Sequence, residues 1–145
     1  MSFTDFITDN GRRIRKEHFI HLVQVARMDD KVNQSELDLL HKEGKKFGLT
    51  DPEIDEILKS EKTHYYDPPY SLSDKFDQLY NISKMILADD IVTESEKKMI
   101  KVYAIAAGFN SENVEKLLDL FVDEIRKGTG EEELFKKLQS IVSGK

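Results

Sequence analysis

The chain has 145 residues, enough for one domain whose hydrophobic core needs neither disulfides nor a structural metal. It contains no cysteine, which excludes thiolate zinc sites and cysteine nucleophiles and is compatible with a reducing cytoplasm. The 22 basic and 28 acidic residues leave a net charge of −6, which argues against nucleic acid or an anionic membrane as the main partner. No apolar run approaches the length of a bilayer-spanning helix, and Met1–Asn10 does not read as a signal peptide, so we expect a cytoplasmic protein without membrane insertion.

Apolar residues recur at helical spacing along most of the chain, in stretches separated by polar breaks. The first stretch covers Arg12–Met28, and the residues before it allow a short separate helix near Phe3–Ile7. The next stretch carries Leu40 and Phe47 and stops at Gly48, because glycine readily takes the left-handed conformation that ends a helix. Further helices are expected over Ser73–Leu87, Glu94–Ala107, Ser111–Arg126 and Glu131–Val142.

A strong signal for the start of a helix lies at Thr50-Asp51-Pro52-Glu53. Thr50 can cap the helix, Pro52 suits its first turn, and Glu53 stands three residues after Thr50, where it can complete a capping box. The sequence therefore predicts a helix that begins directly after Thr50.

No segment alternates well enough for a strand, so the sequence predicts an all-α fold, a bundle of seven to eight helices in a single domain over residues 1–145. An internal repeat organises the bundle, because a shift of 60 positions aligns Phe19–Leu58 with Leu79–Leu118 without a gap. The identical pairs are Asp29/Asp89, Asp30/Asp90, Val32/Val92, Ser35/Ser95, Glu36/Glu96, Gly48/Gly108 and Leu58/Leu118. We therefore expect two tandem three-helix repeats, at about 19–58 and 79–118, joined by a linker at about 63–71.

The repeats share an acidic turn between their first and second helices. In each turn a potential cap residue, Asn33 or Thr93, precedes Glu36 or Glu96 by three positions, which is the spacing of a capping box. Capping and turn geometry are therefore sufficient to explain the pattern.

The same turns also allow a cation site, because consecutive carboxylates and a nearby glutamate supply the hard oxygen ligands that Ca²⁺ and Mg²⁺ prefer. The candidate metal ligands are Asp29, Asp30 and Glu36 in the first turn and Asp89, Asp90 and Glu96 in the second. The first turn is not an EF-hand loop, because Lys31, Gln34 and Leu40 occupy three of the required positions counted from Asp29. The second turn fails in the same way.

An apolar helix followed by Ala/Met-Asp-Asp-x-Val-x-x-x-Glu and by a helix that ends in glycine resembles the TerB-like family. That family includes tellurite-resistance protein B and the amino-terminal region of a membrane-anchored J-domain co-chaperone. The resemblance covers about Phe19–Leu118 and appears in both repeats, with Asp-Asp where the family usually has Asp-Gly. It implies an all-helical bundle with an acidic surface, metal binding, and association with stress-response or membrane-linked complexes, without catalytic activity.

Two further sets of residues carry weaker signals. Tyr65, Tyr66 and Tyr70 beside Pro68-Pro69 either form a peptide-binding surface or pin the linker onto the bundle. Glu17, His18 and His21 lie at helical spacing and either form a weak metal signal or belong to an ordinary, partly exposed helix face, whereas His41 and His64 have no companion that spacing reveals.

Signatures of nucleophilic catalysis, phosphate-binding glycine loops and metalloprotease helices are absent from the sequence. We therefore expect a non-enzymatic, TerB-like interaction module, an adaptor for a protein partner in a stress-response-type complex. The alternative is a divalent-cation-binding protein that uses the two acidic turns for Ca²⁺ or Mg²⁺. No other cofactor is expected.

Overall fold

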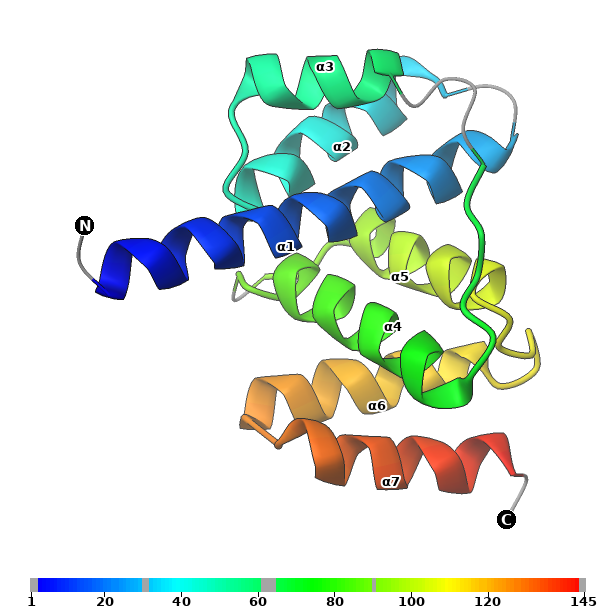
Figure 1. Cartoon of the computed structure of the whole chain (residues 1–145). Coiled ribbons are helices and arrows are strands. Elements are labelled where there is room, and N and C mark those ends of the chain that lie inside the picture. Colours follow the sequence, from blue (N-terminus) through cyan, green and yellow to red (C-terminus); the bar gives the residue numbers. More distant parts are fainter. Residues whose placement is uncertain (1–2, 30–31, 61–64, 90, 144–145) are drawn as a thin grey trace. The chain divides into compact units, whose positions relative to one another are not determined.

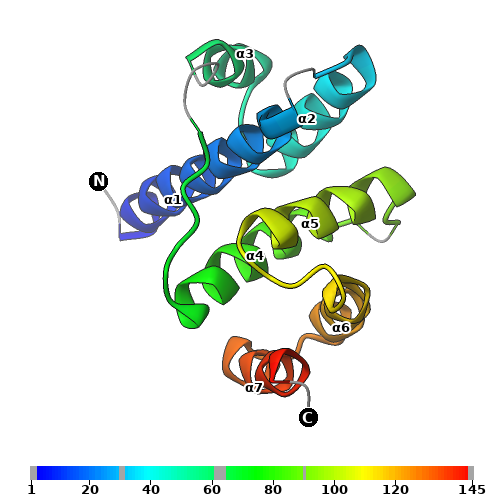
Figure 2. The same cartoon turned by 90° about the vertical axis from the view of Figure 1, so that its right-hand side faces the viewer.

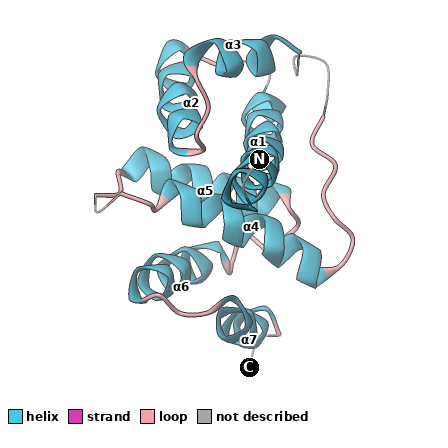
Figure 3. Cartoon of the chain, turned by 60° about the vertical axis from the view of Figure 1, so that its left-hand side comes forward, coloured by secondary structure: helices cyan, strands magenta, loops and turns pink. Residues whose placement is uncertain are grey.

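The computed structural model describes residues 3–29, 32–60, 65–89 and 91–143, without the side chains of residues 3–14 and 29. Within these ranges the chain forms seven α-helices and no strand, which confirms the all-α class (Figure 1, Figure 3). The helices are α1 (Phe3–Ala26), α2 (Gln34–Lys46), α3 (Asp51–Ser60), α4 (Leu72–Ile86), α5 (Glu94–Ala106), α6 (Val114–Lys127) and α7 (Glu131–Val142). A short 3-10 turn, η1 (Arg27–Asp29), follows α1.

The helices fall into two compact units along the chain. Unit 1 covers Met1–Tyr66 and contains α1 to α3, with α3 packed on both α1 and α2. Unit 2 covers Asp67–Lys145 and contains α4 to α7, with α4 in contact with the other three helices. Helices α6 and α7 lie side by side within unit 2 (Figure 2).

Most predicted helix bounds agree with the structure, and two differ. No separate short helix forms near Phe3–Ile7, because these residues belong to the unbroken helix α1. Helix α6 begins at Val114 and not at Ser111. The residues before it form a turn, in which the side chain of Asn110 accepts a hydrogen bond from the Glu112 N–H at 2.9 Å.

A cluster of fully buried side chains from all three helices forms the core of unit 1. The rings of Phe19 on α1 and Phe47 at the end of α2 lie 5.6 Å apart, and neither residue is exposed to solvent. Ile54 on α3 is equally buried, and Gly44 on α2 is buried against it. Close packing of this kind makes the core sensitive to the volume of each side chain.

An aromatic cluster packs α7 against α4 within unit 2. The ring of Phe76 on α4 stacks on Phe135 of α7 with a centroid distance of 4.9 Å. The same ring meets Phe121 of α6 edge-on at 5.9 Å. Leu134 and Leu138 of α7 are also fully buried, so α7 contributes side chains to the core of unit 2.

Helices α2 and α5 end in the same way, 60 residues apart. Gly48 and Gly108 follow them with φ angles of 86° and 108°, which confirms the two predicted glycine stops. The next N–H groups, of Leu49 and Phe109, donate to the carbonyls of Gly44 and Ala104, both at 3.0 Å. This backward bond satisfies a carbonyl that the end of a helix leaves without an intrahelical partner.

A basic side chain from the first helix of each unit binds the same end. The Arg15 Nε donates to the Phe47 carbonyl at 3.3 Å, and the Lys75 Nζ donates to the Ala107 carbonyl at 2.8 Å. Each residue of the second pair lies 60 positions after its counterpart in the first pair. A positive charge at this end is favourable, because the C-terminus of a helix carries a partial negative charge. Every buried position from 32 to 60 also has a buried counterpart 60 residues later.

Candidate functional site

The two acidic turns end in helix caps. At α2 the Asn33 side chain accepts a hydrogen bond from the Glu36 N–H at 2.8 Å. At α5 the Thr93 hydroxyl accepts from the Glu96 N–H at 3.1 Å, and Glu96 Oε1 accepts from the Thr93 N–H at 3.0 Å. The capping box predicted for Thr93 and Glu96 is therefore confirmed, and so is the one at Thr50, where the reciprocal bonds to Glu53 measure 3.0 and 3.3 Å.

The predicted cation ligands in these turns are only partly described. Glu96 is fully buried, and one of its carboxylate oxygens serves the cap, whereas Glu36 is half-buried and Asp89 is exposed. Asp30 and Asp90 lie outside the described residues, as does the side chain of Asp29. Among the side chains that are described, no group of three or more is placed to hold a metal ion. The cation site stays a prediction.

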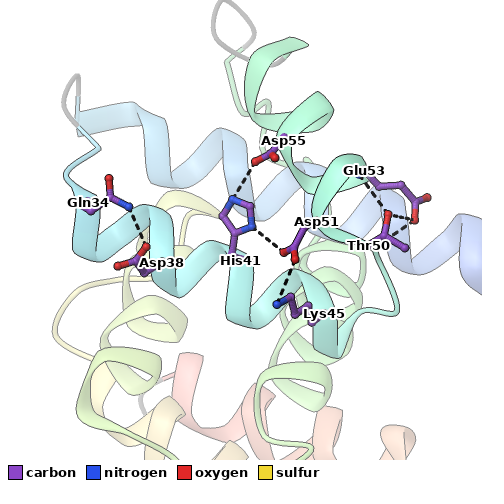
Figure 4. Close-up of polar contacts among 8 residues, drawn as sticks. All are labelled: Gln34, Asp38, His41, Lys45, Thr50, Asp51, Glu53 and Asp55. Carbon is purple, nitrogen blue, oxygen red and sulfur yellow. Dashed lines mark hydrogen bonds and ion pairs between the residues drawn. The ribbon is translucent and has the colours of Figure 1, made fainter.

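A polar cluster joins α2 to α3 in unit 1 (Figure 4). The His41 ring lies between two carboxylates of α3, with Nδ1 3.1 Å from Asp51 and Nε2 3.0 Å from Asp55 (Figure 4). Lys45, one turn later on α2, approaches Asp51 at 3.4 Å. The hydrogen bond from His41, assisted by Lys45, holds the pKa of the Asp51 carboxyl below its usual range.

Sequence reasoning gave His41 no partner, although a signal was available in the repeat. The pair His41–Asp55 corresponds, 60 positions later, to Lys101–Glu115, and these two side chains form an ion pair at 2.8 Å between α5 and α6. The alignment of the repeats places a basic residue at 41 and 101 and an acidic residue at 55 and 115, which was the available signal for a charge pair.

An open pocket of about 590 Å³ lies at the start of α4 in unit 2. Its lining residues are Asp67, Pro68, Pro69, Tyr70, Asp74, Asp77 and Gln78, and we call this set the acidic pocket. The lining contains three carboxylates and, among the described residues that form it, no lysine or arginine. Ser71 caps α4 beside the pocket by accepting a hydrogen bond from the Asp74 N–H at 3.2 Å.

Neighbouring groups fix the polar wall of the acidic pocket. The Tyr103 hydroxyl donates to the Gln78 side chain at 2.9 Å, and the Asn81 amide donates to the Asp77 carboxylate at 3.2 Å. Glu131, the first residue of α7, also faces Asp77. Partial desolvation, together with the hydrogen bond and charge of Asp77, raises the pKa of the Glu131 carboxyl, as expected for two carboxyl groups that lie close together beside the pocket.

The three tyrosines predicted to act together have different environments. Tyr66 is buried, and its ring meets His21 of α1 edge-on at 5.9 Å, as expected for an aromatic that pins the linker. Tyr65 and Tyr70 are exposed, and Tyr70 is 102% exposed at the acidic pocket. Tyr66 therefore fits the interpretation that the aromatics pin the linker, whereas for Tyr65 and Tyr70 the peptide-binding interpretation stays a prediction.

No family model, curated protein or solved structure matches this chain. The resemblance to the TerB-like family therefore stays a prediction. In the part of the chain that the structure describes, no helix combines the length and the apolar character that crossing a membrane requires.

Proposed function

We propose that the chain is a non-enzymatic, TerB-like interaction module, an adaptor in a stress-response-type complex that binds a partner protein at the acidic pocket. The observation that carries this proposal is the fully exposed ring of Tyr70 beside a pocket lined by three carboxylates. Aromatic side chains supply much of the binding energy at protein interfaces, and this one contributes nothing to the core.

The shape of the pocket favours binding with little loss of entropy. Pro68 and Pro69 restrict the backbone of the lining segment that precedes α4, and α4 holds Asp74 and Asp77 in the same lining. A rigid surface loses less conformational freedom on association than a flexible one. The pocket is therefore largely preorganised for a ligand group.

The charge of the pocket selects the chemistry of that group. Three carboxylates without a basic neighbour in the lining favour a cation, and a guanidinium matches carboxylates with two parallel hydrogen bonds. The ring of Tyr70 also offers a face on which a guanidinium can stack. We therefore expect an arginine-bearing segment of the partner in the acidic pocket.

We also infer that the single TerB-like domain arose from two copies of one three-helix repeat. The support is the recurrence at a spacing of 60 of the helix caps, the glycine stops, the basic side chains at the helix ends and the buried positions. In this proposal α7 is an addition to the second copy, attached through Phe135 and Leu138.

A tripeptide probe tests the acidic pocket. We expect acetyl-Leu-Arg-Leu-amide to shift the NMR amide signals of residues 67 and 70–78, and acetyl-Leu-citrulline-Leu-amide, which lacks the charge, to shift them far less. The double variant Asp74→Asn/Asp77→Asn should bind the arginine probe about tenfold more weakly, since charge-assisted hydrogen bonds are lost.

The matched control is Asp119→Asn, which removes an exposed carboxylate of α6 outside the pocket. It should leave binding of the probe unchanged. Equal shifts with the arginine and citrulline probes, or equal affinity of the pocket variant and wild type, would contradict the assignment of the pocket.

A further inference from the structure

The contact between α2 and α3 contains a histidine between two carboxylates, and the proposed function as an interaction module does not use it. We propose that His41 is a pH-dependent latch, which holds α3 on α2 when its ring is protonated and weakens that contact when the ring loses a proton. The latch belongs to unit 1 and is separate from the acidic pocket of unit 2.

The protonation state follows from the two distances at the ring. A neutral imidazole carries one N–H, whereas an ionised carboxylate only accepts hydrogen bonds. Both ring nitrogens of His41 lie within hydrogen-bond distance of a carboxylate oxygen, at 3.1 Å from Asp51 and 3.0 Å from Asp55 (Figure 4). In a neutral ring one nitrogen lone pair would face a negative oxygen, so the geometry favours a ring with an N–H on both nitrogens.

The charged groups around the ring favour the same form. Asp51 and Asp55 face it from α3, and Lys45 on α2 offsets one of them through its contact with Asp51. Asp38, one turn earlier on α2, accepts a hydrogen bond from Gln34 at 2.8 Å (Figure 4). The His41 side chain is 29% exposed, so solvent screens the contact in part and protons reach the ring.

The second repeat provides an internal reference without the latch. Lys101 and Glu115 occupy the positions of His41 and Asp55 and join α5 to α6 at 2.8 Å. A lysine ammonium stays charged over the range in which a histidine titrates. The α5–α6 contact therefore contains no histidine whose loss of a proton could weaken it, whereas the α2–α3 contact does.

The direction of the effect follows from the charge of the ring. Stabilisation of α3 by His41 is present while the ring is protonated and is lost when rising pH removes its second proton. The lowered pKa of Asp51 keeps that carboxylate ionised at the acidic end, so the latch operates there. Helix α6 should keep its protection across the same range.

Two NMR measurements on the full chain test the latch. At pH 5.5 the ring of His41 should carry protons on both nitrogens. Between pH 5.5 and pH 8, amide protection in α3, corrected for intrinsic exchange rates, should fall by a factor of up to about five, the size expected for a partly exposed charge pair. Protection in α6 should stay constant.

Exchanging residues between the repeats supplies the control variants. His41→Lys should abolish the pH dependence in α3, because it installs the cation that the second repeat uses. Lys101→His should transfer a pH dependence to α6. A single protonated nitrogen on His41 at pH 5.5 would overturn the proposal, and so would an unchanged pH dependence of α3 in His41→Lys, which would assign it to His18, His21 or His64.

Discussion

Replacing Phe76 with alanine is expected to lower the free energy of unfolding of unit 2 by about 3–5 kcal/mol. The side chain is 3% exposed, and its ring contacts Phe135 of α7, Phe121 of α6 and Tyr80 of its own helix. Truncation therefore removes buried area and leaves a cavity where three helices meet. Urea unfolding followed by circular dichroism measures the loss, and amide exchange should show α7 losing protection first.

Phe76→Leu is the matched control for this prediction. Leucine keeps most of the apolar volume but not the stacked ring, so it should cost less than half as much as alanine. A loss below about 1 kcal/mol for Phe76→Ala would show that the aromatic cluster does not hold α7 in the core of unit 2.

Gly44→Ala is expected to destabilise unit 1 by about 2 kcal/mol, although alanine is the better helix former. Helix propensity alone would stabilise by about 1 kcal/mol. A methyl group at this position would lie 2.6 Å from Ile54 Cδ1, 2.7 Å from Ile54 Cγ1 and 3.1 Å from Phe19 Cζ. Both neighbours are fully buried, so they cannot move aside into solvent, and overpacking outweighs the gain in propensity.

The second repeat shows how this clash is avoided. Ala104 and Val114 occupy the positions that Gly44 and Ile54 occupy in unit 1. The side chain on α5 is therefore one carbon larger than its counterpart on α2, and the side chain on α6 is one carbon smaller than its counterpart on α3. The double variant Gly44→Ala/Ile54→Val should therefore recover most of the stability lost in Gly44→Ala. The two single variants complete a double-mutant cycle, and losses that simply add in the double variant would contradict the equivalence of the two pairs.

Features of the fold that depend on local chemistry could be predicted from the sequence. The capping boxes at Thr50 and Thr93 and the stops at Gly48 and Gly108 each need residues within a few positions, and all four are confirmed. The start of α6 was predicted too early for an equally local reason. Asn113 replaces the glutamate that completes the box in the first repeat, so no capping box forms there.

The candidate sites depend on distances that only the folded chain sets. The spacing of His41 from Asp51 and Asp55 fits no ligand motif, and the packing of α3 on α2 creates the contact. The acidic pocket was likewise not predicted, since it requires the loop at 67–70 to lie beside two carboxylates of α4. Sequence alone also could not show that Tyr66 is buried while Tyr70 is exposed.

Photo-crosslinking in the cells of origin tests the proposed role as an adaptor most directly. A photoreactive phenylalanine analogue in place of Tyr70 should form one discrete adduct with a partner protein, and Asp74→Asn/Asp77→Asn in the same chain should abolish it. The same analogue at exposed Lys116 of α6 should form no such adduct. An adduct that persists without the two carboxylates, the same adduct from position 116, or none from position 70 would contradict binding of a partner at the acidic pocket.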